Sequence, residues 1–329
     1  MRKLICVALA LIAVLSAQAK DKYDNPDTIV VSRDGTGQFR NISEAIEVCR
    51  AFMEYHKVIY VKKGTYKEKL IVSQWLTNIE ICGEDRDKTI ITWDDHANIQ
   101  ADISPLTSHR SPQKIGTFRT YTLKIQGSCI TLKNITIENN SARLGQAVAL
   151  HTEGDRLTFI NCRFLGHQDT IYTGNAKTRL YFQDCYIEGT TDFIFGPSTA
   201  WFENCDIFCK ADSYITAAST PQDVPYGYIF NNCRITTDEK VSKVYLGRPW
   251  RDYGYTLFMN CELPRQIRPE GWHQWRPEAV KTARYMEYNN RGEGAATDKR
   301  VAWSRQLTKK EAQKITKETV FNIDDSWNP

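Results

Sequence analysis

A short pattern that recurs every 20 to 28 residues constrains the fold of this chain most strongly. Each copy has an apolar or aromatic pair, then Asn or Asp, then Cys, then an apolar residue that favours strands. The copies are centred on Cys162, Cys185, Cys205, Cys233 and Cys261, and an earlier relative has Ile135 in the cysteine position. A repeat of this length is typical of a solenoid, in which each repeat forms one coil.

Each copy of the repeat is strand-like, with alternating apolar positions and turn residues beyond them. Coils of this length without helical stretches predict an all-β parallel β-helix. Cysteines at the same position in successive coils would then stack as a ladder in the core, where a free thiol packs as a small hydrophobic group. A disulfide between adjacent rungs remains an alternative. Catalytic use is disfavoured because no basic partner recurs beside the cysteines.

The two ends of the chain and one internal segment depart from the repeat. Residues 43–55 carry apolar side chains at helical spacing, with Ser43 as N-cap, and predict a short helix that caps the open end of the solenoid. Residues 94–116 are polar with two prolines and predict a long loop. Residues 307–319 predict a charged helix along the outside. No shift in composition indicates a second domain.

The N-terminus has the features of a secretory signal peptide. Arg2 and Lys3 precede the apolar run 4–15, and residues 16–19 (SAQA) resemble a cleavage site. The run is too short to span a membrane; a buried first helix is the alternative. We therefore predict an exported protein, periplasmic or secreted, with a signal peptide at residues 1–19 and a single β-helix domain at residues 20–329.

The composition excludes some classes of partner. Without Arg2 and Lys3, 41 of the 43 basic residues remain against 39 acidic residues, and no basic block occurs. Nucleic-acid binding therefore has no support, and no membrane partner is predicted. A weakly basic balance is compatible with a polyanionic substrate.

Two aspartates share one position in the repeat. Asp169 lies seven residues after Cys162, and Asp192 lies seven residues after Cys185. Equal offsets in stacked coils predict that the two carboxylates lie one above the other, about 5 Å apart. Two carboxylates that close cannot both ionise easily, so the pair suits acid/base or acid/nucleophile chemistry. The alternative is a pair of solvated turn aspartates.

The neighbours of these aspartates favour a functional pair. Gln168 and Thr170 flank the first aspartate, and Phe193 and Phe195 follow the second, so amide and aromatic groups surround both carboxyls. Aromatic surroundings desolvate a carboxylate and raise its pKa. Arg248 could lower the pKa of one member, although its coil has a longer turn and the repeat phase alone does not bring it to the pair.

At these residues the chain resembles the pectin methylesterases (pectinesterases). The matching segments are 64–68 (GTYKE), 146–150 (QAVAL), 166–172 (GHQDTIY), 192–196 (DFIFG), 246–250 (LGRPW), 271–275 (GWHQW) and 287–292 (EYNNRG). Seven motifs in one order, from about residue 29 to about residue 319, make the resemblance specific. It implies a right-handed parallel β-helix, pectin (methyl-esterified homogalacturonan) as substrate, no metal or other cofactor, and a cell-wall target. We expect a monomer.

The resemblance also implies a role for each matching residue. Asp192 would be the nucleophile, Asp169 the general acid and then base, and Arg248 the group that orients Asp192. Gln146 and Gln168 would hold the oxyanion. The resemblance further implies that Trp250 and Trp272 line the sugar groove and that Phe195 lies near the methyl group. His167 is more simply a packing or substrate contact than a catalyst.

Three departures from the family pattern concern the substrate rather than the chemistry. Ile171 replaces the usual Leu, Pro197 replaces a small or polar residue, and the 94–116 loop is long.

The residues alone leave two other functions open. A polygalacturonase-type glycosidase is also a β-helix, and two carboxylates about 5 Å apart suit a retaining mechanism. The two glutamines and the arginine favour the ester, because glycoside hydrolysis needs no oxyanion hole. A non-catalytic polysaccharide-binding β-helix would keep the tryptophans and lack the acid pair.

Overall fold

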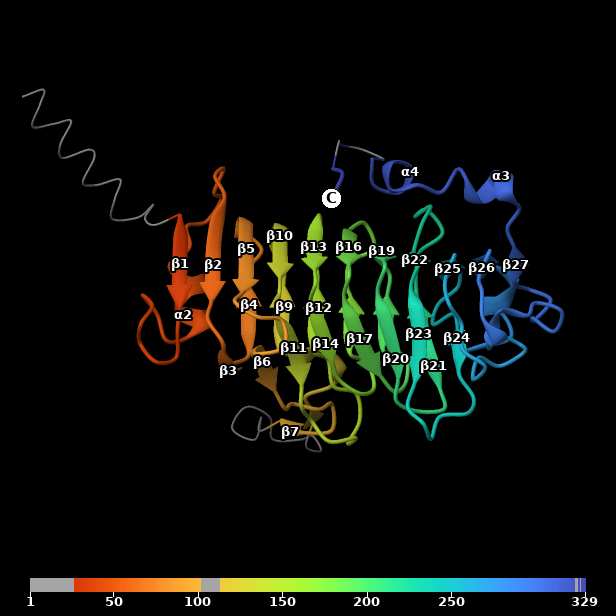
Figure 1. The fold of residues 1–329 in the computed structure, drawn as a ribbon, viewed down its shortest axis with the longest axis horizontal. Helices are drawn as coiled ribbons and strands as arrows, with labels where there is room; N and C mark the ends of the chain where they lie inside the picture. The colour runs from red at the N-terminus through yellow and green to blue at the C-terminus, as the bar shows by residue number, and fades with distance from the viewer. Residues whose placement is uncertain (1–26, 102–112, 323–324, 326) are drawn as a thin grey trace, which may run out of the picture.

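The computed structural model describes residues 27–101, 113–322, 325 and 327–329. Three long sheets form the body of this part of the chain (Figure 1). The first has 11 strands and the other two have seven each, because the coils at the two ends add strands to the first sheet only. Neighbouring strands within these three sheets pair in parallel, for example β10 with β13 and β15 with β18. The predicted all-β parallel β-helix is confirmed.

The strands of each sheet follow one another along the solenoid axis. The first sheet contains β1 (Thr28–Val31), β2 (Lys57–Val61), β5 (Thr77–Gly83), β10 (Ser128–Lys133), β13 (Leu157–Ile160), β16 (Arg179–Gln183), β19 (Thr199–Glu203), β22 (Tyr228–Asn231), β25 (Tyr255–Met259), β26 (Arg284–Tyr288) and β27 (Arg305–Gln306). The second sheet contains β3 (Gly64–Lys67), β6 (Thr89–Trp93), β11 (Thr136–Asn139), β14 (Arg163–Leu165), β17 (Tyr186–Gly189), β20 (Asp206–Cys209) and β23 (Arg234–Thr237). The third sheet contains β4 (Leu70–Val72), β9 (Leu123–Ile125), β12 (Leu150–Thr152), β15 (Ile171–Thr173), β18 (Ile194–Gly196), β21 (Tyr214–Ala218) and β24 (Tyr245–Gly247).

The Asn or Asp of each repeat makes the turn from the first sheet to the second. These residues adopt left-handed backbone angles, with φ of 50° at Asn161, 53° at Asp184, 53° at Asn204, 53° at Asn232 and 58° at Asn260. Asn and Asp tolerate this region better than other residues with a Cβ. Their amides also bond from coil to coil, as when Asn232 Nδ2 donates to Asn204 Oδ1 at 2.7 Å. The repeat therefore encodes the corner of each coil.

The cysteine after each corner points into the core. The five repeat cysteines are buried, and all nine cysteines in the described part of the chain are free. Each repeat thiol lies near backbone carbonyls of the preceding coil; Cys185 Sγ, for example, is 3.4 Å from Phe159 O. The prediction of buried structural thiols is confirmed, and the alternative of a disulfide between adjacent rungs is wrong.

A column of phenylalanines lies beside the thiols. Phe159, Phe182, Phe202, Phe230 and Phe258 stack with ring centroids 4.4, 4.6, 4.4 and 4.3 Å apart in turn. All five side chains are fully buried. This stack binds consecutive coils to one another through the middle of the solenoid.

Phe202→Ala is expected to lower the free energy of unfolding by about 3–5 kcal/mol, because it leaves a cavity between two stacked rings. Urea unfolding followed by circular dichroism measures the change. Phe208→Ala is the matched control, because that ring is only half-buried and stacks at the longer distance of 6.3 Å. Equal losses in the two variants would contradict a special contribution from the internal column.

The capping helix is shorter than predicted. Helix α2 (Ile42–Glu47) covers the first-coil end of the solenoid, and its N-cap is Asn41 rather than Ser43. The Glu68 carboxylate accepts the first two backbone N–H groups of the helix, at 3.0 and 2.9 Å. The predicted helical pattern extends to residue 55, but the chain leaves helical geometry by Phe52, where φ is 56°.

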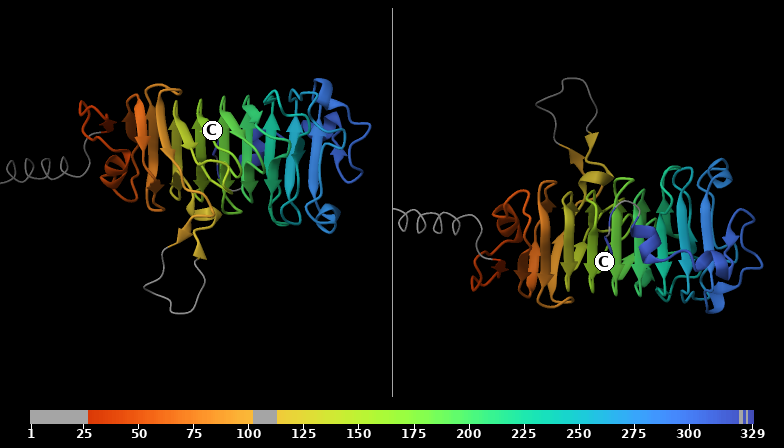
Figure 2. Two further views of the ribbon diagram at one scale, coloured as in Figure 1. Left: turned by 90° about the horizontal axis from the view of Figure 1, so that it is seen from below. Right: turned by 90° about the horizontal axis from the view of Figure 1, so that it is seen from above.

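The predicted 94–116 loop contains a two-stranded hairpin. Strands β7 (Gln100–Ala101) and β8 (Gln113–Lys114) pair antiparallel. The hairpin projects away from the stacked coils (Figure 2), and the short 3-10 helix η1 (Thr117–Arg119) leads back to them. Residues 102–112 lie outside the described part. Two more 3-10 turns, η2 (Ala279–Lys281) and η3 (Glu293–Ala295), connect the last coils.

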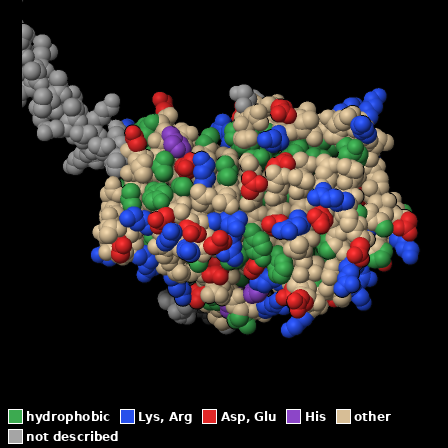
Figure 3. Space-filling model, viewed as in Figure 1, with side chains coloured by type: hydrophobic (Ala, Val, Ile, Leu, Met, Phe, Trp, Pro, Cys, Tyr) green, Lys and Arg blue, Asp and Glu red, His purple; other side chains and the backbone are tan. Residues whose placement is uncertain are grey.

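The C-terminal segment packs along the outside of the first sheet, as predicted, but as two short helices. These are α3 (Lys309–Ala312) and α4 (Lys317–Phe321), each with a threonine N-cap and a capping box. Val320 and Phe321 are buried against outward-facing side chains of the sheet. The space-filling view from the viewpoint of Figure 1 shows acidic and basic side chains interspersed, without a block of one sign (Figure 3).

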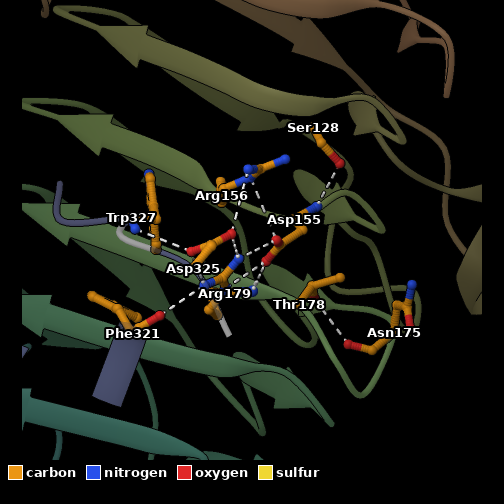
Figure 4. A network of polar contacts seen from close by, with 9 residues as sticks. All are labelled: Ser128, Asp155, Arg156, Asn175, Thr178, Arg179, Phe321, Asp325 and Trp327. Atoms are coloured by element: carbon orange, nitrogen blue, oxygen red, sulfur yellow. Dashed lines mark hydrogen bonds and ion pairs between the residues drawn. The ribbon is translucent and has the colours of Figure 1, made fainter. Parts of the chain in front are cut away.

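An arginine of the first sheet fastens the end of this segment (Figure 4). Arg179 Nη2 lies 2.6 Å from Asp155 Oδ2, and its Nη1 lies 2.7 Å from Asp325 Oδ1. Nη1 also donates to the carbonyl oxygen of Phe321 at 2.7 Å. One guanidinium thus joins the β-helix body to the tail through charge-assisted bonds.

The predicted signal peptide, residues 1–19, lies outside the described residues. In the part of the chain that is described, no helix is long and apolar enough to cross a membrane.

Candidate active site

The two aspartates lie on adjacent coils, just before strands β15 and β18. Ile171 pairs with Ile194, which places Asp169 and Asp192, each two residues earlier, at the same level. The backbone agrees, because Asp169 N–H donates to Thr191 O at 3.1 Å. Both aspartates have left-handed backbone angles, with φ of 68° and 48°. The shared offset from the cysteines therefore correctly predicts that the two residues stack.

Both carboxyl groups are buried. Asp169 is 8 % exposed and Asp192 is 4 % exposed, so the alternative of two solvated turn aspartates is wrong. Burial raises the pKa of Asp169 well above its usual range, the charge of Asp192 raises it further, and Arg248 opposes the shift. Asp169 therefore binds a proton more readily than an ordinary carboxyl group.

Arg248 meets Asp192 through a bidentate pair. Its Nε donates to Oδ1 at 3.0 Å and its Nη2 donates to Oδ2 at 2.6 Å. Burial raises the pKa of Asp192, and the two bonds from Arg248 lower it. Asp192 is therefore the more acidic member of the pair and the one that carries the charge.

A close approach of two coils brings Arg248 to this position. Its backbone N–H donates to Thr216 O at 3.0 Å. The preceding residue is Gly247, where an added Cβ would lie 1.9 Å from Thr216 Oγ1, so the approach requires glycine. The guanidinium lies between two aromatic rings, 3.9 Å from the Tyr214 centroid and 4.1 Å from the Trp275 centroid.

The two glutamines lie on the coils that carry and precede Asp169. Gln168 immediately precedes Asp169, and its carbonyl accepts the N–H of Ala147 at 3.0 Å. Gln146 is thus adjacent to Gln168 across the coil boundary, and both side chains are half-buried. The backbone therefore places both glutamines on coils at or next to the acid pair, and their role in holding an oxyanion stays a prediction.

An apolar surface flanks the acid pair on the third sheet. Phe195 is 5 % exposed and lies 5.9 Å from the ring of Trp250 and 4.9 Å from that of Tyr172. Val148 and Ala217 complete this group. The resemblance predicts Phe195 and Trp250 here but gives no role to Tyr172, although Tyr172 lies in the matching segment 166–172.

Comparison with known proteins decides the family. The sequence profile of the Pectinesterase family matches residues 28–324. The chain belongs to the pectinesterase family. It is 37% identical to Pectinesterase 31 of Arabidopsis thaliana over 287 residues, covering 86% of this chain and 88% of that protein.

Several of the matched relatives are longer than this chain. A probable pectinesterase/pectinesterase inhibitor of Brassica napus is 36% identical over 90% of this chain, and the chain spans about half the length of that relative. Among solved structures, pectin methylesterase from carrot superposes with a TM-score of 0.81 at 31% identity. The superposition covers 91% of this chain and 94% of the carrot protein, so the whole β-helix is shared.

The expectation that Trp272 lines the sugar groove is wrong. Its side chain is fully buried and packs on Phe258 and Tyr285, with ring centroids 5.9 and 4.8 Å away. Gly271, with φ of 69°, makes a turn that directs the next side chain into the core. Trp275, three residues later, is 38 % exposed and lies over Arg248.

His167 is half-buried and lies next to Gln168 in the chain. Burial lowers its pKa to about 4, and Lys210 and Arg143 contribute to the shift. The imidazole is therefore neutral at pH 7.

Within the described residues, no group of three His, Cys, Asp or Glu side chains is arranged to hold a metal ion.

Gln168→Ala is expected to lower kcat for ester hydrolysis about 100-fold, because it removes one hydrogen-bond donor from the developing oxyanion. KM should change little, because this bond strengthens mainly in the transition state. Methanol release from methylated pectin measures both constants. Gln183→Ala, on the outer surface of the first sheet, is the control and should retain wild-type kinetics. A rise in KM with unchanged kcat would indicate a binding role instead.

Proposed function

We propose that this chain removes methyl groups from pectin, hydrolysing the galacturonate methyl ester to methanol and pectate through an aspartate nucleophile. One observation carries the proposal. A buried carboxylate, Asp192, is held by two bonds from Arg248 directly beside Asp169, a carboxyl whose pKa is raised. This is a charged nucleophile next to a proton donor.

In the first step, Asp192 attacks the ester carbonyl carbon. The amides of Gln146 and Gln168 donate to the developing oxyanion. Asp169 protonates the departing methoxide, and methanol leaves an acyl-enzyme anhydride.

In the second step, water hydrolyses the anhydride. Asp169, now ionised, takes a proton from the water as it attacks the acyl carbon. The C–O bond to Asp192 breaks, which releases galacturonic acid and restores the starting state of both aspartates. The product acid then loses its proton to solvent and becomes the carboxylate. Each proton and oxygen is accounted for by ester, water, solvent and the two carboxyls, so the cycle requires no cofactor.

The apolar surface beside the pair suits the substrate. We place the ester methyl near Phe195 and the sugar rings against Trp250 and Trp275, because aromatic faces stack on the apolar faces of sugars. Trp275 thus takes the position first expected for Trp272. The proposal includes export through the predicted signal peptide and action as a single chain.

The test is incubation with methylated polygalacturonate, in which methanol and new reducing ends are measured together. Methanol without reducing ends is the expected result. Reducing ends without methanol would indicate a glycosidase instead. Pectin binding without either product would indicate a non-catalytic binding protein.

A further inference from the structure

A stack of aromatic and basic side chains extends from the acid pair along the third sheet. In order, it contains Trp275, Arg248, Tyr214, Tyr245 and Arg268, and we call it the aromatic stack. Arg248 lies 4.1 Å from the first ring centroid and 3.9 Å from the second. The two tyrosine rings are 5.3 Å apart and nearly parallel, at 13°, and Arg268 lies 4.8 Å from the second of them.

The backbone places this stack next to the nucleophile. Asp192 N–H donates to Tyr214 O at 2.9 Å, so Tyr214 is on the coil directly after the nucleophile. Tyr214 pairs in register with Tyr245 on the following coil. The column that carries two carboxylates on two coils therefore carries two tyrosines on the next two.

Rings on both faces restrict how the Arg248 guanidinium can move. A bidentate pair needs the guanidinium and the carboxylate close to one plane. Trp275 on one face and Tyr214 on the other leave rotation within that plane as the main freedom. Cation–π attraction adds to this restraint.

Tyr214 itself is well fixed. Tyr245 covers its second face, and its hydroxyl lies 3.4 Å from His273 Nδ1. Burial and the nearby Arg248 lower the pKa of His273, so this imidazole is neutral at pH 7. Among the described residues, Asp169 and Asp192 interact electrostatically with Arg248, and Arg268 lies beyond the tyrosines, over the ring of Tyr245.

We propose that Tyr214 is a positioning residue for the ester hydrolysis described above, and that it acts by holding the Arg248 guanidinium in the plane of the Asp192 carboxylate. The inference rests on the proposed function. The sequence motifs that indicate the acid pair and the arginine do not include Tyr214.

Tyr214→Leu removes the ring and tests the proposal. We expect kcat to fall about tenfold, with KM within about threefold of wild type, because the lost contact is with Arg248 rather than with the sugar. A looser arginine lowers the pKa of Asp192 less, so the acid limb of the kcat/KM profile should move to higher pH. A merely structural effect would not move that limb.

Two variants separate the effect of the ring face from the effects of the hydroxyl and of lost stacking between coils. Tyr214→Phe keeps the face and loses the hydroxyl, and should stay within about twofold of wild type. Tyr186→Leu is the matched control, because Tyr186 also stacks on a ring of the next coil and lies under Arg163, but on the second sheet. It should leave kcat and the acid limb unchanged.

A double-mutant cycle with Arg248→Lys tests whether Tyr214 acts through the arginine. Lysine cannot form the flat bidentate pair. We expect Tyr214→Leu to reduce kcat less than about threefold in the lysine background. Thermal unfolding of each variant confirms folding, and Tyr214→Met replaces the leucine variant if that variant does not fold.

Three results would overturn the inference: wild-type kcat and acid limb in Tyr214→Leu, a change in KM alone, or equal losses in both backgrounds of the cycle. Each of these presupposes a wild-type enzyme that releases methanol. Absence of methanol from the wild type would instead refute the proposed function.

Discussion

Asp192→Asn is expected to lower methanol release from pectin by at least about 10⁴-fold, the order of loss seen when an enzyme loses its nucleophile. A carboxamide does not attack an ester carbonyl, and it cannot form the charged pair with Arg248. The variant should still bind pectin, because the surface formed by Trp250 and Phe195 is unchanged. Methanol release and pectin binding, measured on the same preparation, check both parts.

Trapping the intermediate makes this test sharper. Hydroxylamine should convert the wild-type acyl-enzyme anhydride to a hydroxamate, and Asp192→Asn should give none. Asp206→Asn is the matched control, because Asp206 also pairs with an arginine, Arg234, at 2.8 Å but on the second sheet. It should turn over at the wild-type rate. Substantial turnover by Asp192→Asn would refute the nucleophile assignment.

The acid pair was predictable from sequence because both aspartates occupy the same position in their coils. Stacked coils in register bring equal offsets together, so counting from Cys162 and Cys185 was enough to pair Asp169 with Asp192. Counting residues in this way could not place Arg248 next to the pair, because its coil has a longer turn. Its position depends on the close approach at Gly247, which is a property of packing between two coils.

Side-chain direction at turns was not predictable from local sequence. Trp272 and Trp275 lie in the same turn-like segment, and Trp272, which follows the left-handed angle at Gly271, enters the core while Trp275 stays partly exposed. The capping helix illustrates a related limit. Its first N–H groups are satisfied by Glu68, 26 and 25 residues later in the chain, rather than by the local cap Ser43.

Asp169→Asn is expected to lower kcat on pectin about 10³-fold, within the range for loss of a general acid and base. Asparagine has nearly the shape of the protonated acid, so the charged pair of Asp192 and Arg248 should persist and KM should change little. The nucleophile remains, so a galacturonate ester with an acidic phenol as leaving group should still acylate the enzyme. We expect a burst of phenol equal to the enzyme concentration and then slow turnover, because the water lacks its base.

The pH dependence of activity tests whether Asp169 carries the catalytic proton. Activity requires Asp192 ionised and Asp169 protonated, so the wild-type profile should fall at low pH as Asp192 gains a proton. It should fall again at high pH as Asp169 loses its own, and this second limb lies well above the usual carboxyl range because burial and the adjacent charge raise that pKa. Asp169→Asn should keep the acid limb and lose the alkaline one. An alkaline limb that survives in the variant would show that it belongs to another group and that Asp169 does not carry the proton.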